Sequence, residues 1–429
     1  MKDTGLKNLL VIAYLFPPLG GSGALRPLKL AKYLPHYGWR PIVLSAKNSD
    51  WYYAYDPELL TELPSDAVIK RSFMFKASWF YRVLNPYKNP RLDRFLRHVF
   101  FHPDEQIGWL PFGWHAGRRL IQRHNIQAIY STSGPLTNHL IARRLKQRFG
   151  IYWQAEFRDE WFEAPNLSLP TRFHRRLHYS LEKKIVTRAD KIVAMAPEFC
   201  NYLAKHKVDK DKFCTLTAGY DPEDLQQYVL PQGAGPRQGL FRIAFIGLFY
   251  ETFRPTALLR AVTELIDQGV IGAHEVRIQF VGANSPEDIP WPDKYRVCKF
   301  TGFLKRREAL GHLAISDALL LLLSKERGPG VIPSKVFEYI GFGKPILALV
   351  PPHSTVAGII TAEQAGIVAD FEDIAAIKNA FLQLITRWRR GDLATPSRRN
   401  DIAQYDYRCI TQRFAALLDE GCRRISKTI

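Results

Sequence analysis

Cysteine is scarce in this 429-residue sequence, and its five residues stand far apart without a CxxC pair or a neighbouring histidine cluster. Such spacing predicts neither a disulfide framework nor a zinc site, and it fits a protein of the reducing cytosol. Long apolar runs are also missing. Leu9–Phe16 is broken by Pro17 and Pro18, and Ala318–Leu323 has only the length of a strand. We therefore expect neither a signal peptide nor a membrane-spanning helix.

Acidic residues are too few to balance the basic ones, which leaves a net charge of +19 and favours polyanionic partners. Between Lys70 and Phe101, eight Lys or Arg residues accompany one acid and nine aromatic residues. This mixture suits an anionic membrane surface, whereas no RNP-like or KH-like signature indicates a nucleic-acid partner. We expect a cytoplasmic protein, peripheral on the inner face of the cell membrane. A solvated basic face over an ordinary aromatic core is the alternative.

The chain is too long for one ordinary core, and its composition, 46% hydrophobic and 24% charged, is that of a folded protein. Strand-like and helix-like runs alternate, which predicts βαβ units on parallel sheets. We predict an α/β protein of GT-B type, with two doubly wound Rossmann-like domains at 1–230 and 242–400 that face each other across a cleft. A Gly- and Pro-rich linker at 231–241 joins them. A C-terminal helix in 401–429 is expected to pack back on the N-terminal domain.

A glycine-rich turn follows the first strand-like run, Leu9–Tyr14, and contains Gly20 and Gly21. Glycine lets the backbone approach a phosphate or sugar closely, and the helix that follows supplies unpaired N–H groups at its N-terminus. Arg26, just inside that helix, is predicted to add a cation to the same site. The turn is neither a GxGxxG motif nor a Walker A loop, and a plain tight turn is the alternative.

A second junction between a loop and a helix lies in Gly330–Pro345. Pro333 ends the loop, and Ser334 is expected to cap the helix, so that the helix dipole points at a ligand. Lys335 in the first turn opposes that dipole, which is easier to understand if an anion binds there. Glu338, one turn further on, has a carboxylate that can accept two hydrogen bonds from a ribose. An ordinary solvated helix residue is the alternative for Glu338.

Two further strand ends carry polar side chains. The run Trp153–Trp161 ends in ionisable residues that include Asp159, at the place where α/β folds put functional groups. An Arg158–Asp159 pair that holds a loop is the alternative. The run Ser131–His139 passes from a strand end into a helix. His139 has the chemistry to hydrogen-bond a sugar or phosphate oxygen near neutral pH, although a single histidine in such a place is more often structural.

Together and in this order, the four motifs resemble the family 4 glycosyltransferases, which are retaining enzymes of GT-B architecture, and in particular a bacterial polysaccharide-biosynthesis branch. The matching stretches are Phe16–Arg26, Thr132–Ala142, Glu156–Trp161 and Pro333–Ala348, within a resemblance that runs from Leu9 to about Val368. It implies transfer of a sugar from a nucleoside-diphosphate sugar to a hydroxyl of a lipid-linked or other glycan acceptor.

The resemblance also implies roles for single residues. Arg254 and Lys335 would neutralise the donor diphosphate without a metal or other cofactor, because no DxD motif offers paired carboxylates in a suitable loop. Phe303 would lie beside the nucleobase, and Asp159 and His139 would line the acceptor side. The implied catalytic set is Asp159, His139, Arg254 and Lys335. The implied donor-binding set is Gly20, Gly21, Arg26, Gly247, Phe303, Ser334 and Glu338.

The sequence departs from the family pattern at several positions. Gly330 stands where many relatives carry the first glutamate of a Glu-x7-Glu motif, so the usual contact to the transferred sugar would come from Glu326 or from backbone. Glu156 and Glu160 replace an aspartate and a proline. Two other functions stay open: another GT-B enzyme such as a sugar-nucleotide epimerase, and a non-catalytic protein that binds nucleic acid or membranes. The sugar, the base and the acceptor are not specified by the sequence.

Overall fold

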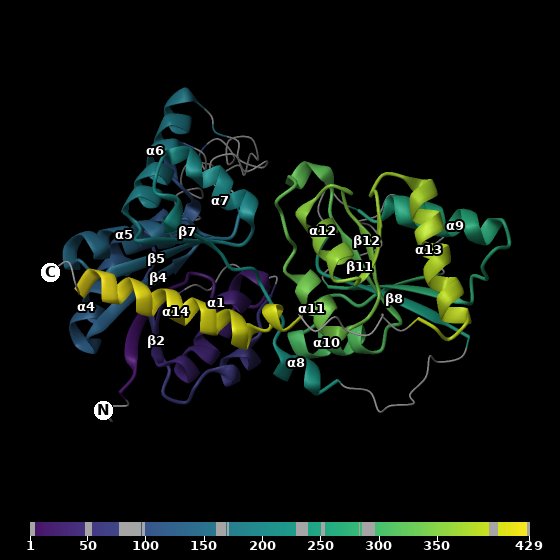
Figure 1. Ribbon diagram of the computed structural model, residues 1–429, viewed down its shortest axis with the longest axis horizontal. Coiled ribbons are helices and arrows are strands. Elements are labelled where there is room, and N and C mark those ends of the chain that lie inside the picture. The colour runs from purple at the N-terminus through teal and green to yellow at the C-terminus, as the bar shows by residue number, and fades with distance from the viewer. Residues whose placement is uncertain are drawn as a thin grey trace. The chain divides into compact units, whose positions relative to one another are not determined.

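The computed structural model describes residues 5–47, 54–76, 96, 99–159, 169, 171–228, 239–249, 254–282, 284, 297–393 and 402–426. The chain forms two compact units (Figure 1). The first unit combines Met1–Thr217 with Tyr407–Ile429, and the second is Ala218–Asp406. Each unit has one parallel sheet with helices packed against it, so the prediction of two α/β domains is confirmed.

The first unit has a seven-stranded sheet of order β3-β2-β1-β4-β5-β6-β7, in which every described pair is parallel. Its strands are β1 (Lys7–Ile12), β2 (Trp39–Ala46), β3 (Val68–Ser72), β4 (Ile126–Thr132), β5 (Tyr152–Phe157), β6 (Lys191–Ala194) and β7 (Phe213–Thr215). Its α-helices are α1 (Ser22–Tyr33), α4 (Leu110–His124), α5 (Thr137–Phe149), α6 (Arg172–Arg188), α7 (Pro197–Leu203) and α14 (Tyr407–Ser426).

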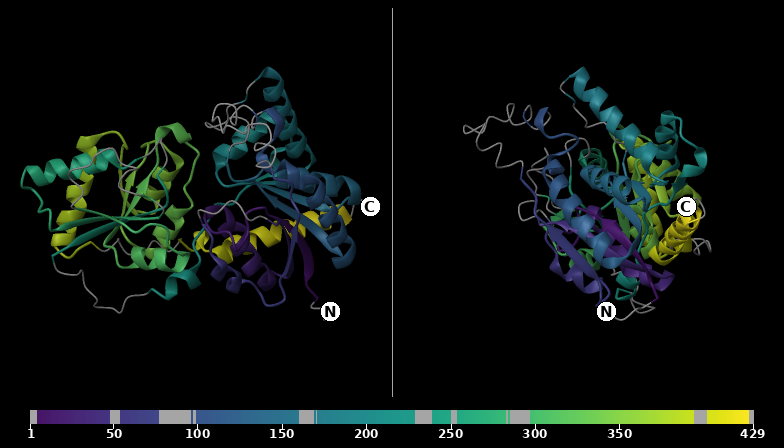
Figure 2. Two further views of the ribbon diagram at one scale, coloured as in Figure 1. Left: turned by 180° about the vertical axis from the view of Figure 1, so that it is seen from behind. Right: turned by 90° about the vertical axis from the view of Figure 1, so that its left-hand side faces the viewer.

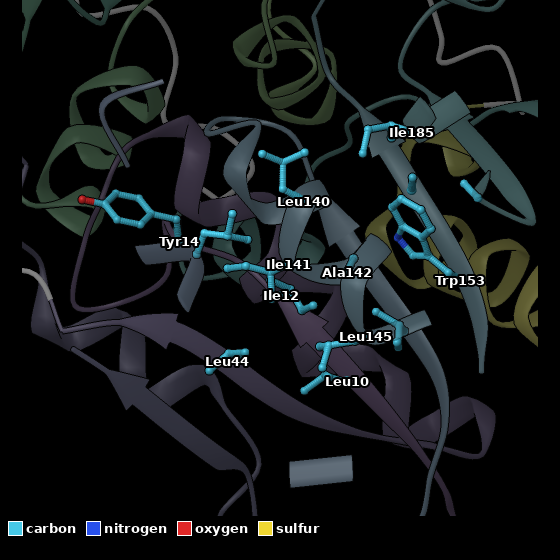
Figure 3. Close-up of a cluster of buried hydrophobic side chains, with 14 of the residues drawn as sticks. Leu10, Ile12, Tyr14, Leu44, Leu140, Ile141, Ala142, Leu145, Trp153 and Ile185 are labelled. Atoms are coloured by element: carbon cyan, nitrogen blue, oxygen red, sulfur yellow. The ribbon is translucent and has the colours of Figure 1, made fainter. Parts of the chain in front are cut away.

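Both faces of this sheet are buried, which explains why its strands are apolar at successive positions rather than at alternate ones. Leu10 and Ile12 of β1 share one cluster with Ile141 and Leu145 of α5 and with Trp153 of β5 (Figure 3). The odd-numbered residues of β1 point to the opposite face, because side chains alternate along a strand. There they meet α1 and the C-terminal helix α14 in a second cluster.

The second unit has a six-stranded parallel sheet of order β10-β9-β8-β11-β12-β13. Its strands are β8 (Phe241–Ile246), β9 (Val276–Val281), β10 (Cys298–Phe300), β11 (Ala318–Leu322), β12 (Ile346–Leu349) and β13 (Gly366–Ala369). Its α-helices are α8 (Pro222–Gln226), α9 (Thr256–Asp267), α10 (Arg306–Ala314), α11 (Lys335–Phe342), α12 (Thr355–Ala362) and α13 (Ile374–Arg389). Helices α9 and α13 share the main apolar cluster with this sheet.

Each sheet reverses its strand order once, between β1 and β4 in the first unit and between β8 and β11 in the second. In open α/β sheets, the connections that follow the two central strands run to opposite faces at such a reversal, at the carboxyl edge of the sheet. Ligands of open α/β sheets bind there. The loops that follow β1 and β8 contain Gly20, Gly21 and Gly247, and are therefore the candidate ligand-binding loops.

The boundaries of the units differ from the predicted ones. The chain passes into the second unit at Thr217–Ala218 rather than near residue 230, because Asp224 of α8 forms an ion pair with Arg306 of α10. It passes back at Asp406–Tyr407. Helix α14, yellow in Figure 2, packs on β4, β5 and α1 of the first unit. Most of the predicted linker at 231–241 lies outside the described residues, since only 239–241 of it is described.

The basic aromatic stretch Lys70–Phe101 also lies largely outside the described residues, which omit 77–95 and 97–98. Phe73, Phe75 and Phe100 are described, and all three side chains are exposed. In the part of the chain that the structure describes, no helix combines the length and apolar character needed to cross a bilayer.

Candidate functional site

The second unit brings Gly247 and Lys335 together at the point where its sheet reverses. Lys335, the first residue of α11, donates a hydrogen bond from Nζ to the carbonyl oxygen of Ile246 over 2.6 Å. The same Nζ lies 4.1 Å from the centre of the Phe245 ring. Gly247 has φ +129°, and a Cβ at this position would lie 2.6 Å from Nζ. A glycine after β8 is therefore what allows the lysine to reach the strand end.

The ammonium group of Lys335 is poorly compensated. Its neighbours are a carbonyl oxygen and an aromatic face, and it forms no ion pair with any residue that the structure describes. Burial lowers the pKa of Lys335 to about 8, and Glu338 only partly opposes this shift. A partly desolvated cation at a helix N-terminus favours binding of an anion, since the anion restores the lost solvation and meets the dipole of α11.

Glu338 lies one turn after Lys335 and is held by an arginine that the sequence analysis overlooked. Arg306 Nη1 is 2.9 Å from Glu338 Oε1, and Arg306 Nη2 is 2.7 Å from Asp224 Oδ2. Burial works against the charge of Arg306, but the two carboxylates outweigh it and raise the pKa of the guanidinium above its usual value. No local signal marks this arrangement, because α8, α10 and α11 are far apart in the sequence.

The loop that follows β8 is held by the side chain of Asn284 and by close packing against Gly282. Buried Asn284 donates from Nδ2 to the carbonyl of Gly247 over 2.7 Å and accepts the N–H of Phe249 at 2.8 Å. At Gly282, φ is +144° and a Cβ would lie 2.3 Å from the carbonyl oxygen of Gly247. Phe303, shortly after β10, exposes 45% of its surface, so its ring is open to a stacking partner.

Ser334 does not cap α11 as predicted. Its backbone is already helical, with φ −55° and ψ −27°, and its side chain makes no capping hydrogen bond. The first turn of α11 is closed instead by backbone hydrogen bonds between residues three apart. The N–H of Val336 donates to the carbonyl of Pro333 at 3.0 Å, and the N–H of Phe337 donates to the carbonyl of Ser334 at 3.2 Å. The prediction of a serine cap is therefore wrong.

Three other predicted positions of the second unit stay open. Arg254 directly precedes Pro255 and α9, is partly exposed, and has no ion pair among the described residues. Its role toward a diphosphate remains a prediction. Gly330 is buried, and Glu326 is exposed in a short 3-10 turn, Lys325–Arg327. The contact to the transferred sugar from Glu326 or from backbone stays a prediction.

In the first unit, the glycine turn lies at the carboxyl end of β1, as predicted. The N–H of Gly20 donates to the carbonyl of Ala54 over 2.8 Å, which ties the turn to a neighbouring loop. Gly21, with φ +79°, precedes α1 and is exposed. It supplies no side-chain cap, and the first turn of α1 contains no acidic residue. The positive end of the α1 dipole is thus not neutralised by its own first turn.

Arg26 does not add its charge to this turn. The side chain is 2% exposed, and its Nη2 lies 2.7 Å from Glu156 Oε1 at the end of β5. It also donates to the carbonyls of Thr217 and Leu216. Burial alone would raise the pKa of Glu156, but Arg26 and Tyr130 outweigh it and lower that pKa. The prediction for Arg26 is corrected: a facing carboxylate turns it into a buried structural ion pair.

Arg158 takes the place beside the turn that was predicted for Arg26. Its Nη1 donates to the carbonyl of Gly23 over 2.8 Å, and its backbone N–H donates to Ser133 Oγ over 2.8 Å. Arg158 therefore joins the glycine turn and the strand ends of β4 and β5. Asp159 follows it and is exposed. The sequence indicated Arg158 only as a partner of Asp159, since nothing local marks its contact across the sheet.

His139 is fully buried rather than exposed on the acceptor side. Its ring stacks on Phe157 with centroids 4.9 Å apart, and its Nδ1 lies 2.8 Å from Ser131 Oγ. That oxygen accepts the indole N–H of Trp153 at 2.8 Å. Burial lowers the pKa of His139 to about 3, so the ring is neutral at physiological pH. Because packed side chains enclose it, the prediction of direct acceptor contact is not supported.

Asp104 is a further group that the sequence analysis did not identify. Its Oδ2 accepts the backbone N–H of Thr137 at 2.9 Å, and its Oδ1 accepts the hydroxyl of Thr137 at 2.6 Å. The N-terminus of α5 is therefore capped by a carboxylate from a distant loop. This occupied helix end contrasts with the N-terminus of α1.

No family model matches the sequence, and no curated protein matches it. Among solved structures, sucrose-phosphate synthase from Thermosynechococcus elongatus is 13% identical with a TM-score of 0.62, over 96% of this chain and 98% of that one. HepE from Anabaena in complex with UDP and glucose is 13% identical with a TM-score of 0.61, over 96% and 99%. UDP-GlcNAc 2-epimerase from Methanocaldococcus jannaschii is 10% identical with a TM-score of 0.53, over 97% and 100%. At these identities the likeness establishes the architecture: the chain has the GT-B fold.

Proposed function

We propose that this protein is a glycosyltransferase that moves a sugar from a nucleoside-diphosphate sugar to a hydroxyl group of a glycan acceptor. The observation that carries the proposal is the pair of opposite charges on α11, at the reversal point of the second sheet. Lys335 presents a cation beside Gly247, and Glu338 presents a carboxylate one turn further on. A nucleoside diphosphate has a matching pair of features, an anionic diphosphate and a ribose with hydroxyl donors.

The chemistry follows from where charge develops. When the bond between the sugar and the diphosphate breaks, negative charge accumulates on the leaving group. A cation and a helix dipole that are already in place stabilise that charge without reorganisation. Lys335 and the N-terminus of α11 would do this from the second unit, together with Arg254. HepE, which resembles this chain in fold, has been solved with UDP and glucose, and this supports a nucleotide-sugar donor.

The finer parts of the proposal come from the sequence motifs. Membership of family 4, transfer with retention of configuration, and a lipid-linked acceptor in cell-surface polysaccharide biosynthesis rest on the four motifs and their order.

Association with an anionic membrane rests on the basic and aromatic residues of Lys70–Phe101. We expect co-sedimentation with vesicles that contain phosphatidylglycerol and a decline as salt rises. Equal binding to phosphatidylcholine vesicles, or no binding to either, would contradict the membrane proposal.

Calorimetric titration with UDP, GDP, dTDP, ADP and their sugar conjugates tests the donor site. We expect one base series to bind, and Glu338→Gln to weaken that binding by about tenfold or more, because a hydrogen bond to a charged acceptor is lost. Glu264→Gln is the matched control, since Glu264 is a half-exposed carboxylate on α9 of the same unit that also pairs with basic residues. If no nucleotide binds the wild-type protein, the donor-site proposal fails and a non-catalytic binding protein becomes the better explanation.

A sugar-nucleotide epimerase is the second candidate, because the fold also resembles a UDP-GlcNAc 2-epimerase. The two activities differ in what they need. An epimerase converts its nucleotide sugar without any acceptor and releases no nucleoside diphosphate. Incubation with the nucleotide sugar that binds, followed by NMR of the sugar ring, separates the two. An acceptor-independent change of ring configuration would favour the epimerase.

A further inference from the structure

Arg306 connects two carboxylates through opposite parts of its guanidinium. Nη2 and Nε lie 2.7 and 3.1 Å from the same oxygen of Asp224, and Nη1 lies 2.9 Å from Glu338 Oε1. The three side chains are only 12 to 16% exposed. Asp224 thus fixes the guanidinium from one side, and the guanidinium in turn fixes one oxygen of Glu338. Such fork geometry is available to arginine and not to lysine.

The contact with Arg306 decides which oxygen of Glu338 is available. Oε1 is occupied, whereas Oε2 has no hydrogen-bond partner among the residues that the structure describes. An isolated glutamate on a helix surface would sample several rotamers, and a ligand would have to pay for ordering it. Here the carboxylate is already oriented, with one oxygen left to accept a hydroxyl.

The contact also keeps Glu338 apart from Lys335. Residues three positions apart on a helix are neighbours on its surface, and a lysine and a glutamate at this spacing readily form an ion pair. In this structure they do not: Lys335 Nζ donates to the Ile246 carbonyl, and Glu338 pairs with Arg306. The cation therefore stays available for an anion, and the carboxylate stays available for a hydroxyl donor.

We propose that Arg306 is a positioning residue of the donor site: anchored by Asp224, it holds Glu338 so that Oε2 accepts a ribose hydroxyl and Lys335 remains free for the diphosphate. This inference rests on the proposed function, because it takes Glu338 as the group that contacts the ribose. The positioning role of Arg306 has a consequence for nucleotide selectivity. The preference of the protein for ribonucleotides over deoxyribonucleotides depends on a residue that never touches the nucleotide.

The test compares nucleotides that differ by one hydroxyl. Calorimetry with UDP, 2′-deoxy-UDP and 3′-deoxy-UDP, repeated with the GDP and ADP series, gives the ribose preference of each variant. We expect the wild-type protein to bind the ribonucleotide about tenfold or more tightly than at least one deoxy analogue. Arg306→Met should abolish that preference. Asp224→Asn, which keeps the size of the side chain and removes the charge that anchors Arg306, should reduce it.

Inorganic pyrophosphate probes the cation separately. When Arg306 is replaced by methionine, Glu338 is free to pair with Lys335, so pyrophosphate binding should weaken as well. In the double variant Arg306→Met/Glu338→Gln, Lys335 has no such competitor and pyrophosphate binding should return. Arg389→Met is the matched control, because Arg389 pairs with Glu275 on the exposed side of the same unit. It should leave both readouts unchanged.

Two failures are distinguishable. If the wild-type protein binds none of the nucleotides, the proposed function fails and the inference falls with it. If Glu338→Gln abolishes the ribose preference but folded Arg306→Met keeps it, the donor site stands and Arg306 has no positioning role. Tighter binding of UDP by Arg306→Met would also overturn the inference, because Arg306 would then be a competitor for Glu338.

Discussion

The two sheets have the same order over their first six strands. Each unit places a basic residue near the start of a helix at the point where the strand order reverses. The environments of these two basic residues differ. Arg26 in the first unit is 2% exposed and paired with Glu156. Among the described residues, Lys335 in the second unit meets a carbonyl oxygen and an aromatic ring but no carboxylate in an ion pair. The difference lies in the nearest carboxylate. Glu156 faces Arg26 directly, whereas Glu338 is held away from Lys335 by Arg306. A basic residue in this position is therefore structural or ligand-facing according to where the neighbouring carboxylate is held.

The largest effect is expected at the buried pair. Arg26→Met leaves Glu156 as a buried carboxylate without its cation, which should lower the free energy of unfolding by about 3–5 kcal/mol. Urea unfolding followed by intrinsic fluorescence measures this, since Trp39, Trp109 and Trp153 are all buried in the first unit. The double variant Arg26→Met/Glu156→Gln should recover part of the loss, because it removes the uncompensated charge.

One outcome would contradict the structural role of Arg26. A variant Arg26→Met with wild-type stability and weakened nucleotide binding would mean that Arg26 faces the ligand, as the sequence motif suggested.

The opposite pattern is expected in the second unit. Lys335→Met should change the stability little, because a cation with few compensating contacts is removed, but it should weaken nucleoside-diphosphate binding by about 10- to 100-fold. Lys344→Met is the control. Lys344 also donates to carbonyl oxygens, those of Ala314 and Ser316, but lies at the far end of α11. A loss of binding in the control as large as in Lys335→Met would show that general damage to the unit explains both.

A smaller effect is expected from pH. Burial lowers the pKa of Lys335 to about 8, so the side chain is cationic below that pH and neutral above it. Affinity for a nucleoside diphosphate should therefore fall by about tenfold as the pH rises from 7 to 9, because pH 9 lies about one unit above this pKa and the bound anion favours the protonated lysine. Lys335→Arg stays protonated over this range and should give a flat profile. Identical profiles for the two proteins would exclude Lys335 as the titrating group.

The sequence predicted the fold well because both sheets are buried on two faces and their strands are therefore continuous apolar runs between amphipathic helices. Among the helix-like runs of the sequence are 172–187 and 374–388, and the structure has helices at Arg172–Arg188 and Ile374–Arg389. The edge strand β3 and the short helix α12 were not predicted. Strand β3 is short and lies at the edge of the sheet, where β2 is its one described strand neighbour, and α12 is too short and too uniformly apolar to show a helical period.

The candidate site was predicted only where its residues are close in sequence. Lys335 and Glu338 lie on one helix, and the parallel topology brings that helix to the end of β8. Arg306 and Arg158 were missed, because their partners come from other elements and leave no local pattern. Arg26 was placed wrongly for the same reason: Glu156, the group that buries it, is 130 residues away in the sequence.

The membership of α14 in the first unit has a consequence for how this chain reaches its native state during synthesis. The first unit buries Phe414, Ala415 and Leu418 against the second face of its sheet, yet these residues leave the ribosome after the whole of the second unit. Until then, the apolar surface that α14 covers is exposed on a nascent chain that already contains all seven strands. The second unit, which is continuous in sequence, is free to complete its core first. Synthesis from the N-terminus therefore need not finish the N-terminal unit first, and a chain that stops at residue 406 would keep an uncovered sheet face that favours aggregation or chaperone binding.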